Sequence, residues 1–384
     1  MSGGSHLLGC YPASRVTFVK GRGCELWDSE GRRYIDFLAG LAVVSLGHAN
    51  PEIAEAMAEQ ALRLVHVSNL FRNEPAEAVA AELDDLLGGG GRVFFCNSGA
   101  EAVEAAVKFA RRWGGGRRTI VAAEGSFHGR TLGALAATGQ PSKREAFEPV
   151  AGGFRHVPFG DAVALEEALD DDVVAVLLEP ILGEGGVVVP PAGYLRRVRE
   201  LCDSKGVLLA VDEIQTGLGR TGTWFAHQHE GIRPDLVCIA KALGNGFPVG
   251  ACWVTTRVAD AIRVGDHGST FGGQPLAMAV ARAVLRELKR VDAPARAQSS
   301  GARLAEMVSK IPQVEQVRGR GLLLAAEFGR PIASDVAERA IENGVVVNAV
   351  TESAIRLAPP LVITDEEITE GTERLAAAIE EVCG

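Results

Sequence analysis

One lysine stands where an amine could act as a nucleophile. Lys241 lies at the end of an apolar run, in DLVCIAKALGNG, directly before a glycine-rich turn. Ligands of open α/β sheets bind at the carboxyl ends of the strands. A lysine in such a low-dielectric position has a depressed pKa and becomes an amine able to form a Schiff base. The alternative is a lysine that only extends from a strand end into water.

A carboxylate occupies a comparable place earlier in the chain. Asp212 ends the apolar part of GVLLAVDEIQTGLGRTG. A carboxylate buried at a strand end needs a cationic partner, because desolvation of an unpaired charge is costly. The candidates are an arginine from a neighbouring loop, a helix N-terminus, or the protonated ring nitrogen of a cofactor that accepts electrons. Gln215, three residues on, is placed to reach a ring oxygen of such a cofactor.

A third stretch, CNSGAEAVEAAVKFARR, predicts a strand followed by a capped helix. Ser98 and Glu101 match the S-x-x-E capping box. The hydroxyl of Ser98 and the free amides of Gly99 and Ala100 would then face a phosphate at the positive end of the helix. A capped helix without a ligand is the alternative interpretation.

Joined in this order, the three pieces resemble the fold-type I pyridoxal-phosphate enzymes and, among them, the class III aminotransferases. The resemblance covers nearly the whole chain and is carried by NSGAEAVEAAVK, SFHGRT, EPILGEGG, DEIQTGLGRTG, AKALGNG and GSTFGG. It implies pyridoxal 5'-phosphate as the cofactor. It also implies an α/β fold, with a mostly parallel seven-stranded sheet in a large domain and a smaller α+β domain.

The resemblance also implies a role for each matching residue. The implied cofactor contacts are Ser98, Gly99, Ala100, Phe127, Asp212, Gln215, Lys241 and Thr270. The first three hold the phosphate, and Phe127 stacks on the ring. Asp212 pairs with the pyridinium nitrogen, Gln215 with the phenolic oxygen, and Lys241 forms the covalent link and later carries the proton. Thr270 reaches the phosphate of the other subunit, which implies a homodimer with shared active sites.

Three charged residues resemble the set with which this family holds substrate carboxylates. They are Arg130 in SFHGRT, Glu184 in ILGEGG and Arg356 in AIRLAPP. Glutamate brings two carboxylates, whereas the reacting end of the amino donor is uncharged. One arginine must therefore be exposed in one half-reaction and neutralised in the other. Glu184 can pair with Arg356 and release it when glutamate arrives.

The implied reaction is transfer of the δ-amine of N2-acetylornithine to 2-oxoglutarate. Leu41 favours this donor over free ornithine, because an apolar wall disfavours a free α-ammonium group and accepts an acetyl methyl group. Val44 and Gln274 depart from the residues usual in the family. Other ω-aminotransferases, for ornithine, succinylornithine, 4-aminobutyrate or a carrier-bound lysine, remain alternatives. A pyridoxal-phosphate fold that has lost catalysis and serves as a binding protein is a remote one.

Short β-branched runs alternate with helical patterns between about residues 50 and 285. The runs are RVFFC, RTIVAA, VVAVLLE, GVLLAVD, DLVCIA and GACWV, and the helical patterns include AEAVEAAVKFARRW and YLRRVRELCDSKG. Continuous apolar strands separated by helices predict a mostly parallel sheet covered on both faces.

The pattern changes after residue 285. A long helix is followed by VEQVRG and GLLLAAEF, a helix near 333–343, the runs VVVN and AIRLA, and a helix over 365–382. Near the start, CELWDSEGRRYIDFLAG predicts a hairpin that turns at Glu30 and Gly31. We therefore expect three parts: an N-terminal segment 1–49 that joins the small domain, a large cofactor-binding domain 50–285, and a small α+β domain 286–384.

Composition excludes several classes of function. The net charge of −10 argues against a polyanionic partner such as nucleic acid. The start, MSGGSHLLGCYP, has no signal-peptide pattern, and no run approaches a membrane span, so we expect a cytoplasmic protein.

The seven cysteines contain no CxxC pair, and we expect no disulfide. His227, His229 and Glu230 could be written as metal ligands, but the stretch is predicted as a loop and we expect no metal. RGRG at 318–321 predicts a turn between strands.

Overall fold

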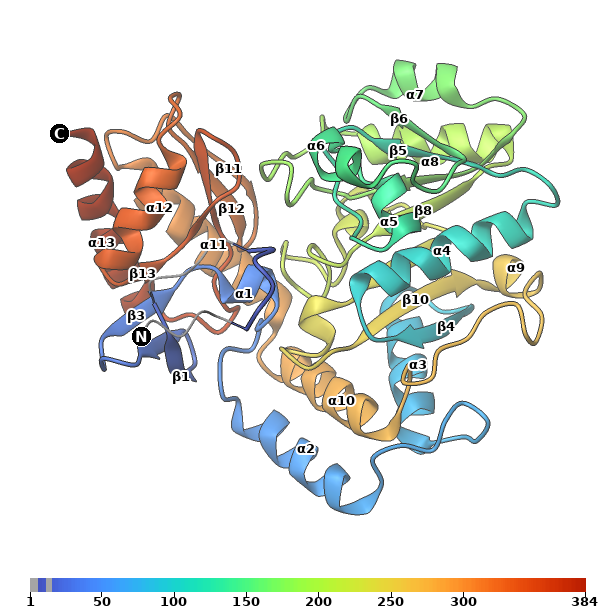
Figure 1. Cartoon of the computed structure of the whole chain (residues 1–384), viewed down its shortest axis with the longest axis horizontal. Coiled ribbons are helices and arrows are strands. Elements are labelled where there is room, and N and C mark those ends of the chain that lie inside the picture. Colours follow the sequence, from blue (N-terminus) through green and yellow to red (C-terminus); the bar gives the residue numbers. More distant parts are fainter. Residues whose placement is uncertain (1–5, 12–15) are drawn as a thin grey trace.

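The computed structural model describes residues 6–11 and 16–384, and a seven-stranded sheet forms the centre of its larger lobe (Figure 1). The strand order is β4-β10-β9-β8-β7-β5-β6. The strands are β4 (Gly91–Cys96), β5 (Thr119–Ala123), β6 (Phe154–Val157), β7 (Val173–Leu178), β8 (Leu208–Asp212), β9 (Leu236–Ile239) and β10 (Gly250–Thr255). β10 runs antiparallel to both of its neighbours, β4 and β9, and the other strand pairs of this sheet are parallel. The predicted mostly parallel sheet is confirmed, and β6 is a strand that the sequence analysis did not name.

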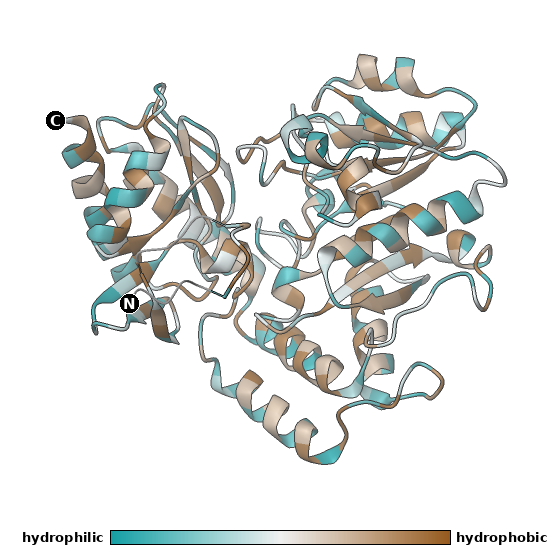
Figure 2. Ribbon diagram, in the orientation of Figure 1, coloured by the Kyte–Doolittle hydropathy of each residue, from teal (hydrophilic) through white to brown (hydrophobic). Residues whose placement is uncertain are grey.

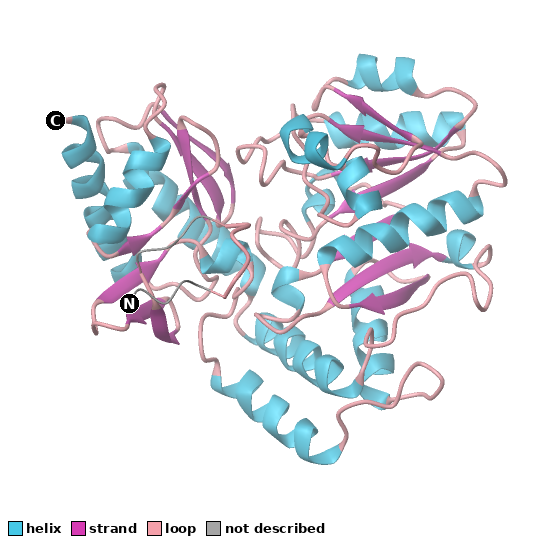
Figure 3. Ribbon diagram, in the orientation of Figure 1, coloured by secondary structure: helices cyan, strands magenta, loops and turns pink. Residues whose placement is uncertain are grey.

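Helices cover both faces of this sheet (Figure 3). Along β8, Leu208 and Ala210 pack on the face of α4 (Gly99–Trp113), whereas Leu209 and Val211 pack on the face of α8 (Tyr194–Lys205). Successive strand residues point to opposite faces, so a strand covered on both sides must be apolar throughout. Figure 2 shows the corresponding hydrophobic colouring along the central strands.

The remaining helices of this lobe complete the two layers. They are α2 (Pro51–Arg63), α3 (Glu74–Leu86), α5 (Leu132–Ala137), α6 (Pro141–Arg144), α7 (Ala162–Ala168), α9 (Thr256–Ala259) and α10 (Pro275–Arg290). Short 3₁₀ helices are η1 (Glu145–Phe147), η2 (Ala226–Glu230) and η3 (Lys241–Leu243). Helix α10 packs against α2 and α3 and also touches α11 of the smaller lobe. The predicted domain boundary at residue 285 therefore falls inside a continuous helix.

The smaller lobe combines two four-stranded sheets with three helices. One sheet has the order β11-β12-β15-β14 and the other β1-β2-β3-β13. The strands are β1 (Phe18–Arg22), β2 (Glu25–Asp28), β3 (Arg33–Asp36), β11 (Gln316–Arg320), β12 (Leu323–Glu327), β13 (Val345–Val346), β14 (Asn348–Ala349) and β15 (Ala354–Leu357). The helices are α11 (Ala293–Ser309), α12 (Ala333–Glu342) and α13 (Asp365–Cys383), and a short turn, α1 (Ala39–Ala42), leads from β3 toward the larger lobe.

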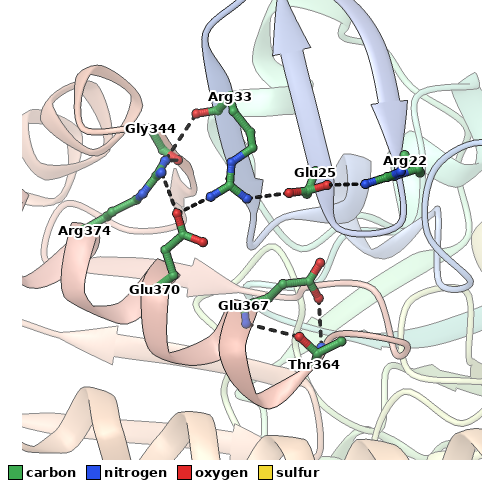
Figure 4. A network of polar contacts seen from close by, with 8 residues as sticks. All are labelled: Arg22, Glu25, Arg33, Gly344, Thr364, Glu367, Glu370 and Arg374. Atoms are coloured by element: carbon green, nitrogen blue, oxygen red, sulfur yellow. Dashed lines mark hydrogen bonds and ion pairs between the residues drawn. The ribbon is translucent and has the colours of Figure 1, made fainter.

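The two ends of the chain meet in this lobe. β3 pairs in parallel with β13, and in Figure 1 the blue N-terminal strands lie beside the red C-terminal helices. Figure 4 shows the polar contacts that join them: Arg33 bridges Glu25 and Glu370, and Arg374 binds both Glu370 (2.6 Å) and the carbonyl of Gly344 (2.8 Å). A Thr364–Glu367 capping box begins α13 beside this network.

Three local predictions have different outcomes. The N-terminal hairpin is confirmed, since β2 and β3 pair antiparallel across the turn at Gly31. The RGRG stretch at 318–321 contributes only its last residue to the turn between two strands, because β11 extends through Arg320 and the chain reverses at Gly321 and Leu322. Residues 226–230 form the 3₁₀ helix η2 and not a loop, because buried Glu213 accepts the amides of Ala226 and His227. Among the described residues, no helix is long and apolar enough to cross a membrane.

Candidate active site

A cavity of about 410 Å³ opens where the central strands end. Nine of the predicted site residues line it: Ser98, Gly99, Ala100, Phe127, Arg130, Glu184, Asp212, Gln215 and Lys241. They follow β4, β5, β7, β8 and β9, whose carboxyl ends all meet at this edge of the sheet. A larger hollow of about 890 Å³ lies between α2, α3 and α10, but it is lined by none of these residues.

Lys241 sits just after β9, at the start of η3, with a left-handed backbone (φ 41°). Its side chain keeps some exposure to the cavity but is otherwise enclosed by protein. This burial lowers the pKa of Lys241 to about 8, while the negative charge of Glu184 opposes the shift. A substantial neutral fraction of the amine is therefore available near neutral pH, which a nucleophilic role requires.

The partner of Asp212 is a histidine. Asp212 is buried at the end of β8, and its Oδ2 lies 2.8 Å from Nδ1 of His128. The other carboxylate oxygen accepts the amide of Ile214 at 3.1 Å. His128 is itself fully buried, and its Nε2 has no hydrogen-bond partner among the described residues. The carboxylate is thus held in a fixed orientation at the cavity wall.

A second buried carboxylate shapes the loops around this pair. Glu179 follows β7 and accepts the amides of Phe127 (2.9 Å) and Gly183 (3.0 Å). Burial raises the pKa of Glu179 to about 7, with His128 opposing the rise and Asp212 adding to it. One side chain therefore anchors both the aromatic residue of the cavity and the loop that carries Glu184.

The N-terminus of α4 points at the cavity from the β4 side. Ser98 is the N-cap, and its Oγ accepts the amide of Glu101 at 3.2 Å. The carboxylate of Glu101 accepts the amide of Asn97 at 2.5 Å and not the amide of Ser98. The second bond of the predicted capping box is therefore made one residue before the N-cap. Helix geometry leaves the first-turn amides, including those of Gly99 and Ala100, without intrahelical acceptors. They form an anion-binding end at the wall of the cavity.

An ion pair closes the side of the cavity near the small lobe. Arg356, fully buried in β15, donates to Glu184 at 2.5 Å and to Oε1 of Gln215 at 3.2 Å, and Asn348 accepts from its Nε at 3.3 Å. Arg356 lowers the pKa of Glu184 against the opposing effect of burial. Arg356 itself is not a lining residue, since Glu184 and Gln215 stand between it and the cavity. Movement of Glu184 would expose the guanidinium.

Arg130 differs from Arg356 in having no acidic partner among the described residues. It lines the cavity and is exposed, with its guanidinium carbon 5.8 Å from the centroid of the Phe127 ring. Two arginines thus flank the cavity, one paired and one available for an anion.

Two predicted residues lie elsewhere. Thr270 is exposed and Leu41 is 39% exposed, and neither lines the cavity. Val43 occupies the wall instead. Leu41 does not reach the wall because residues 39–42 form a left-handed turn, which reverses the direction in which successive side chains point.

Sequence reasoning missed His128, Glu179, Asn97 and Val43 as parts of the site. His128, Glu179 and Asn97 stand inside the motifs SFHGRT, EPILGEGG and NSGAEAVEAAVK, so the signal was a polar residue within a motif already selected. Val43 lacks such a signal, because only the packing of the loops brings it to the cavity.

The residues present fit pyridoxal phosphate. The cavity combines an amine of lowered pKa, a fixed buried carboxylate, an aromatic ring and a helix N-terminus with free amides. These are the groups needed for a carbonyl, a pyridine nitrogen, a ring face and a phosphate. The described residues contain no group of three or more His, Cys, Asp or Glu side chains arranged to hold a metal ion. His227 pairs with Glu213, and His229 faces the carbonyl of Thr221.

Comparison with known proteins agrees with this geometry. The model of the "Aminotransferase class-III" family matches residues 11–379. Acetylornithine aminotransferases from Mycolicibacterium smegmatis and Methanopyrus kandleri are each 48% identical to the chain, over 97% of it and 96% of their own length.

Solved structures give the same result. The ornithine aminotransferase of Toxoplasma gondii superposes with a TM-score of 0.94 at 38% identity, covering 98% of this chain and 93% of that one. The N-acetylornithine aminotransferase of Stenotrophomonas maltophilia gives 0.85 at 41% identity, covering 97% of both. The chain belongs to the class-III aminotransferases and is a pyridoxal-phosphate-dependent enzyme.

Proposed function

We propose that this enzyme transfers the δ-amino group of N2-acetylornithine to 2-oxoglutarate, giving N-acetylglutamate 5-semialdehyde and glutamate. The observation that carries the proposal is the pairing of Arg356 with Glu184 beside an Arg130 that has no acidic partner. One substrate carboxylate can bind Arg130 in both half-reactions, and Arg356 is available for a second one only when Glu184 moves. The relatives named above support the donor.

The residues that would hold the cofactor follow from the geometry. The amine of Lys241 would form the covalent link, and Ser98 with the amides of Gly99 and Ala100 would hold the phosphate. Asp212 would keep the ring nitrogen protonated, and Phe127 would cover one ring face. Gln215 accepts from Arg356 through Oε1, and its Nε2 would be the donor to the phenolic oxygen.

When bound, pyridoxal phosphate supplies an electron sink for the carbon from which a proton is removed. The chain supplies the proton transfer. Lys241, with its lowered pKa, would take the proton from the substrate carbon as a general base and deliver it as a general acid to the C4′ carbon of the cofactor. His128 keeps the carboxylate of Asp212 turned toward the cavity and shields it from solvent. Replacement of Lys241 by Ala should reduce turnover by more than about 100-fold, since general acid–base catalysis is worth roughly 10²–10⁴.

Glu184 separates the two half-reactions. With the monocarboxylate donor bound, Glu184 stays on Arg356 and leaves that end of the cavity neutral. With glutamate bound, its second carboxylate displaces Glu184 and forms a bidentate pair with Arg356.

The variant Glu184→Gln separates this exchange of partners from a purely structural ion pair. The variant should slow the single-turnover reaction with N2-acetylornithine and leave that with glutamate as fast or faster.

The proposal includes a homodimer with shared sites. Thr270 lies outside its own cavity, on a loop that Asn69 holds through the carbonyls of Ser269 and Gly272. Large apolar side chains on this loop and on the adjacent segment are exposed: Leu62, Leu70, Phe71 and Phe271. Exposed apolar clusters of this kind are typical of subunit interfaces.

Free ornithine is the alternative donor, and it is favoured by the high TM-score to the Toxoplasma enzyme. The deciding measurement is kcat/KM for both donors with 2-oxoglutarate. We expect a preference of at least ~100-fold for N2-acetylornithine, because the apolar wall at Val43 offers no partner for an α-ammonium group. Equal values would disprove the donor assignment. Comparison of Leu41→Tyr with Val43→Tyr tells which residue forms that wall. Only the residue that contacts the donor should change the kcat/KM preference between N2-acetylornithine and ornithine.

A further inference from the structure

A second cation that has no acidic partner among the described residues lies beside the Phe127 ring. The ammonium of Lys143 is 5.3 Å from the centroid of this ring, and the guanidinium carbon of Arg130 is 5.8 Å from the same centroid. Lys143 does not line the cavity, but Phe127 and Arg130 do. Two positive charges therefore share one aromatic residue at the edge of the cavity.

The backbone around Phe127 holds this lysine in place. Gln140, the N-cap of α6, donates through Nε2 to the carbonyls of Gly125 (3.1 Å) and Ser126 (3.3 Å), directly before Phe127. Its Oε1 in turn accepts from the ammonium of Lys143 at 2.5 Å. The ammonium is thus tied, through one side chain, to the segment that carries the aromatic ring. Because this holds its position, Lys143 is not an ordinary flexible surface lysine.

Neither cation has an acidic partner in the described part of the chain. The carboxylates nearby are committed elsewhere: Glu184 to Arg356, and Glu179 to two backbone amides. Lys143 is half-buried, and this burial, together with the charges of Arg130 and Arg356, lowers its pKa, while Glu184 opposes the effect. A half-buried ammonium that feels the charge of a second cation near the same ring is in an unfavourable position unless an anion joins them.

We infer that Lys143 is a specificity-determining residue, which together with Arg130 forms a two-cation receptor for the carboxylate at the end of the substrate far from the transferred amine. The inference rests on the proposed transamination, since both 2-oxoglutarate and the donor present a carboxylate at that end. The second charge favours amines and oxo acids with an anionic end over amines that lack one.

The test is a calorimetric titration of the holoenzyme with glutarate, a dicarboxylate that has no amino or oxo group and is not turned over. Lys143→Met should weaken glutarate binding roughly tenfold, the scale of one charge-assisted contact at a partly exposed site. Lys143→Arg keeps the charge and should stay within about threefold of wild type. Lys205→Met, at the exposed end of α8, is the matched control and should bind like wild type. Arg130→Met is the positive control.

Kinetics with 2-oxoglutarate should give the same order, with KM raised in Lys143→Met and kcat changed little, because the residue binds an end of the substrate that does not react. The inference is overturned if Lys143→Met binds glutarate within twofold of wild type, or if Lys143→Arg is as weak as Lys143→Met. A wild type that binds glutarate but does not use N2-acetylornithine would defeat the proposed function and leave the receptor standing.

Discussion

At the scale of single residues, Lys241 shows how one environment sets both the charge and the reactivity of an amine. Enclosure by protein disfavours the ammonium form and lowers the pKa of Lys241. The negative charge of Glu184 is the largest opposing influence and raises the pKa again in part. Glu184 is itself committed to Arg356, so its influence on Lys241 is weaker than that of a free carboxylate. The pKa of the Lys241 amine therefore lies near 8, whereas pairing with Arg356 lowers the pKa of Glu184 and favours its ionised form.

A labelling experiment on the enzyme freed of cofactor checks this balance. Because only the neutral amine reacts, acetylation of Lys241 should rise with pH and reach half its maximum near pH 8, well below the ordinary lysine value of about 10.4. Mass spectrometry follows the modification, with exposed Lys205 as internal reference. Glu184→Gln removes the opposing charge and should move the midpoint lower. A Lys241 midpoint equal to that of Lys205 would contradict the enclosed environment.

At the scale of elements, the turn over residues 39–42 is unusual because four consecutive residues have a left-handed backbone, with φ between 51° and 69°. Only Gly40 among them adopts this conformation without steric cost, and each of the others costs about 1–2 kcal/mol. The turn persists because Asp36 accepts the amides of Leu38 and Ala39, and buried Ala39 and Ala42 anchor it. It delivers Val43 to the cavity wall.

Gly40→Ala isolates the cost of that conformation. A Cβ at position 40 has room, since its nearest neighbour would be the Cβ of Val43 at 3.9 Å. The loss of stability, about 1 kcal/mol by urea unfolding, therefore reflects backbone strain and not a clash. Gly152→Ala, at an open site without a left-handed backbone, is the matched control and should be neutral or slightly stabilising. Equal effects of the two substitutions would argue against a strained turn.

At the scale of the whole molecule, a buried arginine connects the three parts of the chain. Arg220 follows β8 in the larger lobe and is 1% exposed. It donates to the carbonyls of Leu322 (3.0 Å) and Pro359 (2.5 Å) of the smaller lobe and to Oγ of Ser45 (3.1 Å) in the N-terminal segment. Burial lowers its pKa, and Asp36 and Cys24 partly offset the shift. Its five donors suit a junction made of carbonyls.

Arg220→Met should therefore be strongly destabilising, by about 3 kcal/mol or more, because three buried acceptors lose their donor. Arg220→Lys should fall between it and wild type, since an ammonium cannot reach all three. Unfolding in urea measures the effect, and Arg330→Met, at an exposed position, is the control. If the urea midpoint of Arg220→Met shifts no more than that of Arg330→Met, Arg220 does not stabilise the junction.

The proposed dimer makes its own prediction at this scale. Thr270→Ala should weaken cofactor retention roughly tenfold, the cost of one hydrogen bond to a phosphate, while sedimentation still reports a dimer. Dilution below the dimer dissociation constant should have the same effect on wild type. A monomer with full cofactor and activity would contradict both the shared site and the dimer.

The chemical groups of the site could be predicted from local sequence patterns. Lys241, Asp212 and the Ser98 stretch each follow an apolar strand, and parallel strands bring their carboxyl ends to one edge, so local pattern alone places these groups together. The same reasoning found the strands of the sheet except β6, whose residues FRHV lack a continuous apolar run.

The surroundings of those groups depend on the tertiary structure. That Asp212 pairs with His128, that Arg356 lies behind Glu184 and Gln215, and that Lys143 joins Arg130 at Phe127 depends on contacts between segments far apart in the sequence. The left-handed turn that keeps Leu41 out of the cavity has both origins. Asp36 accepts the amides of Leu38 and Ala39 within the same segment, whereas Ala42 is buried in a cluster with Ile181 and Leu323 from distant segments.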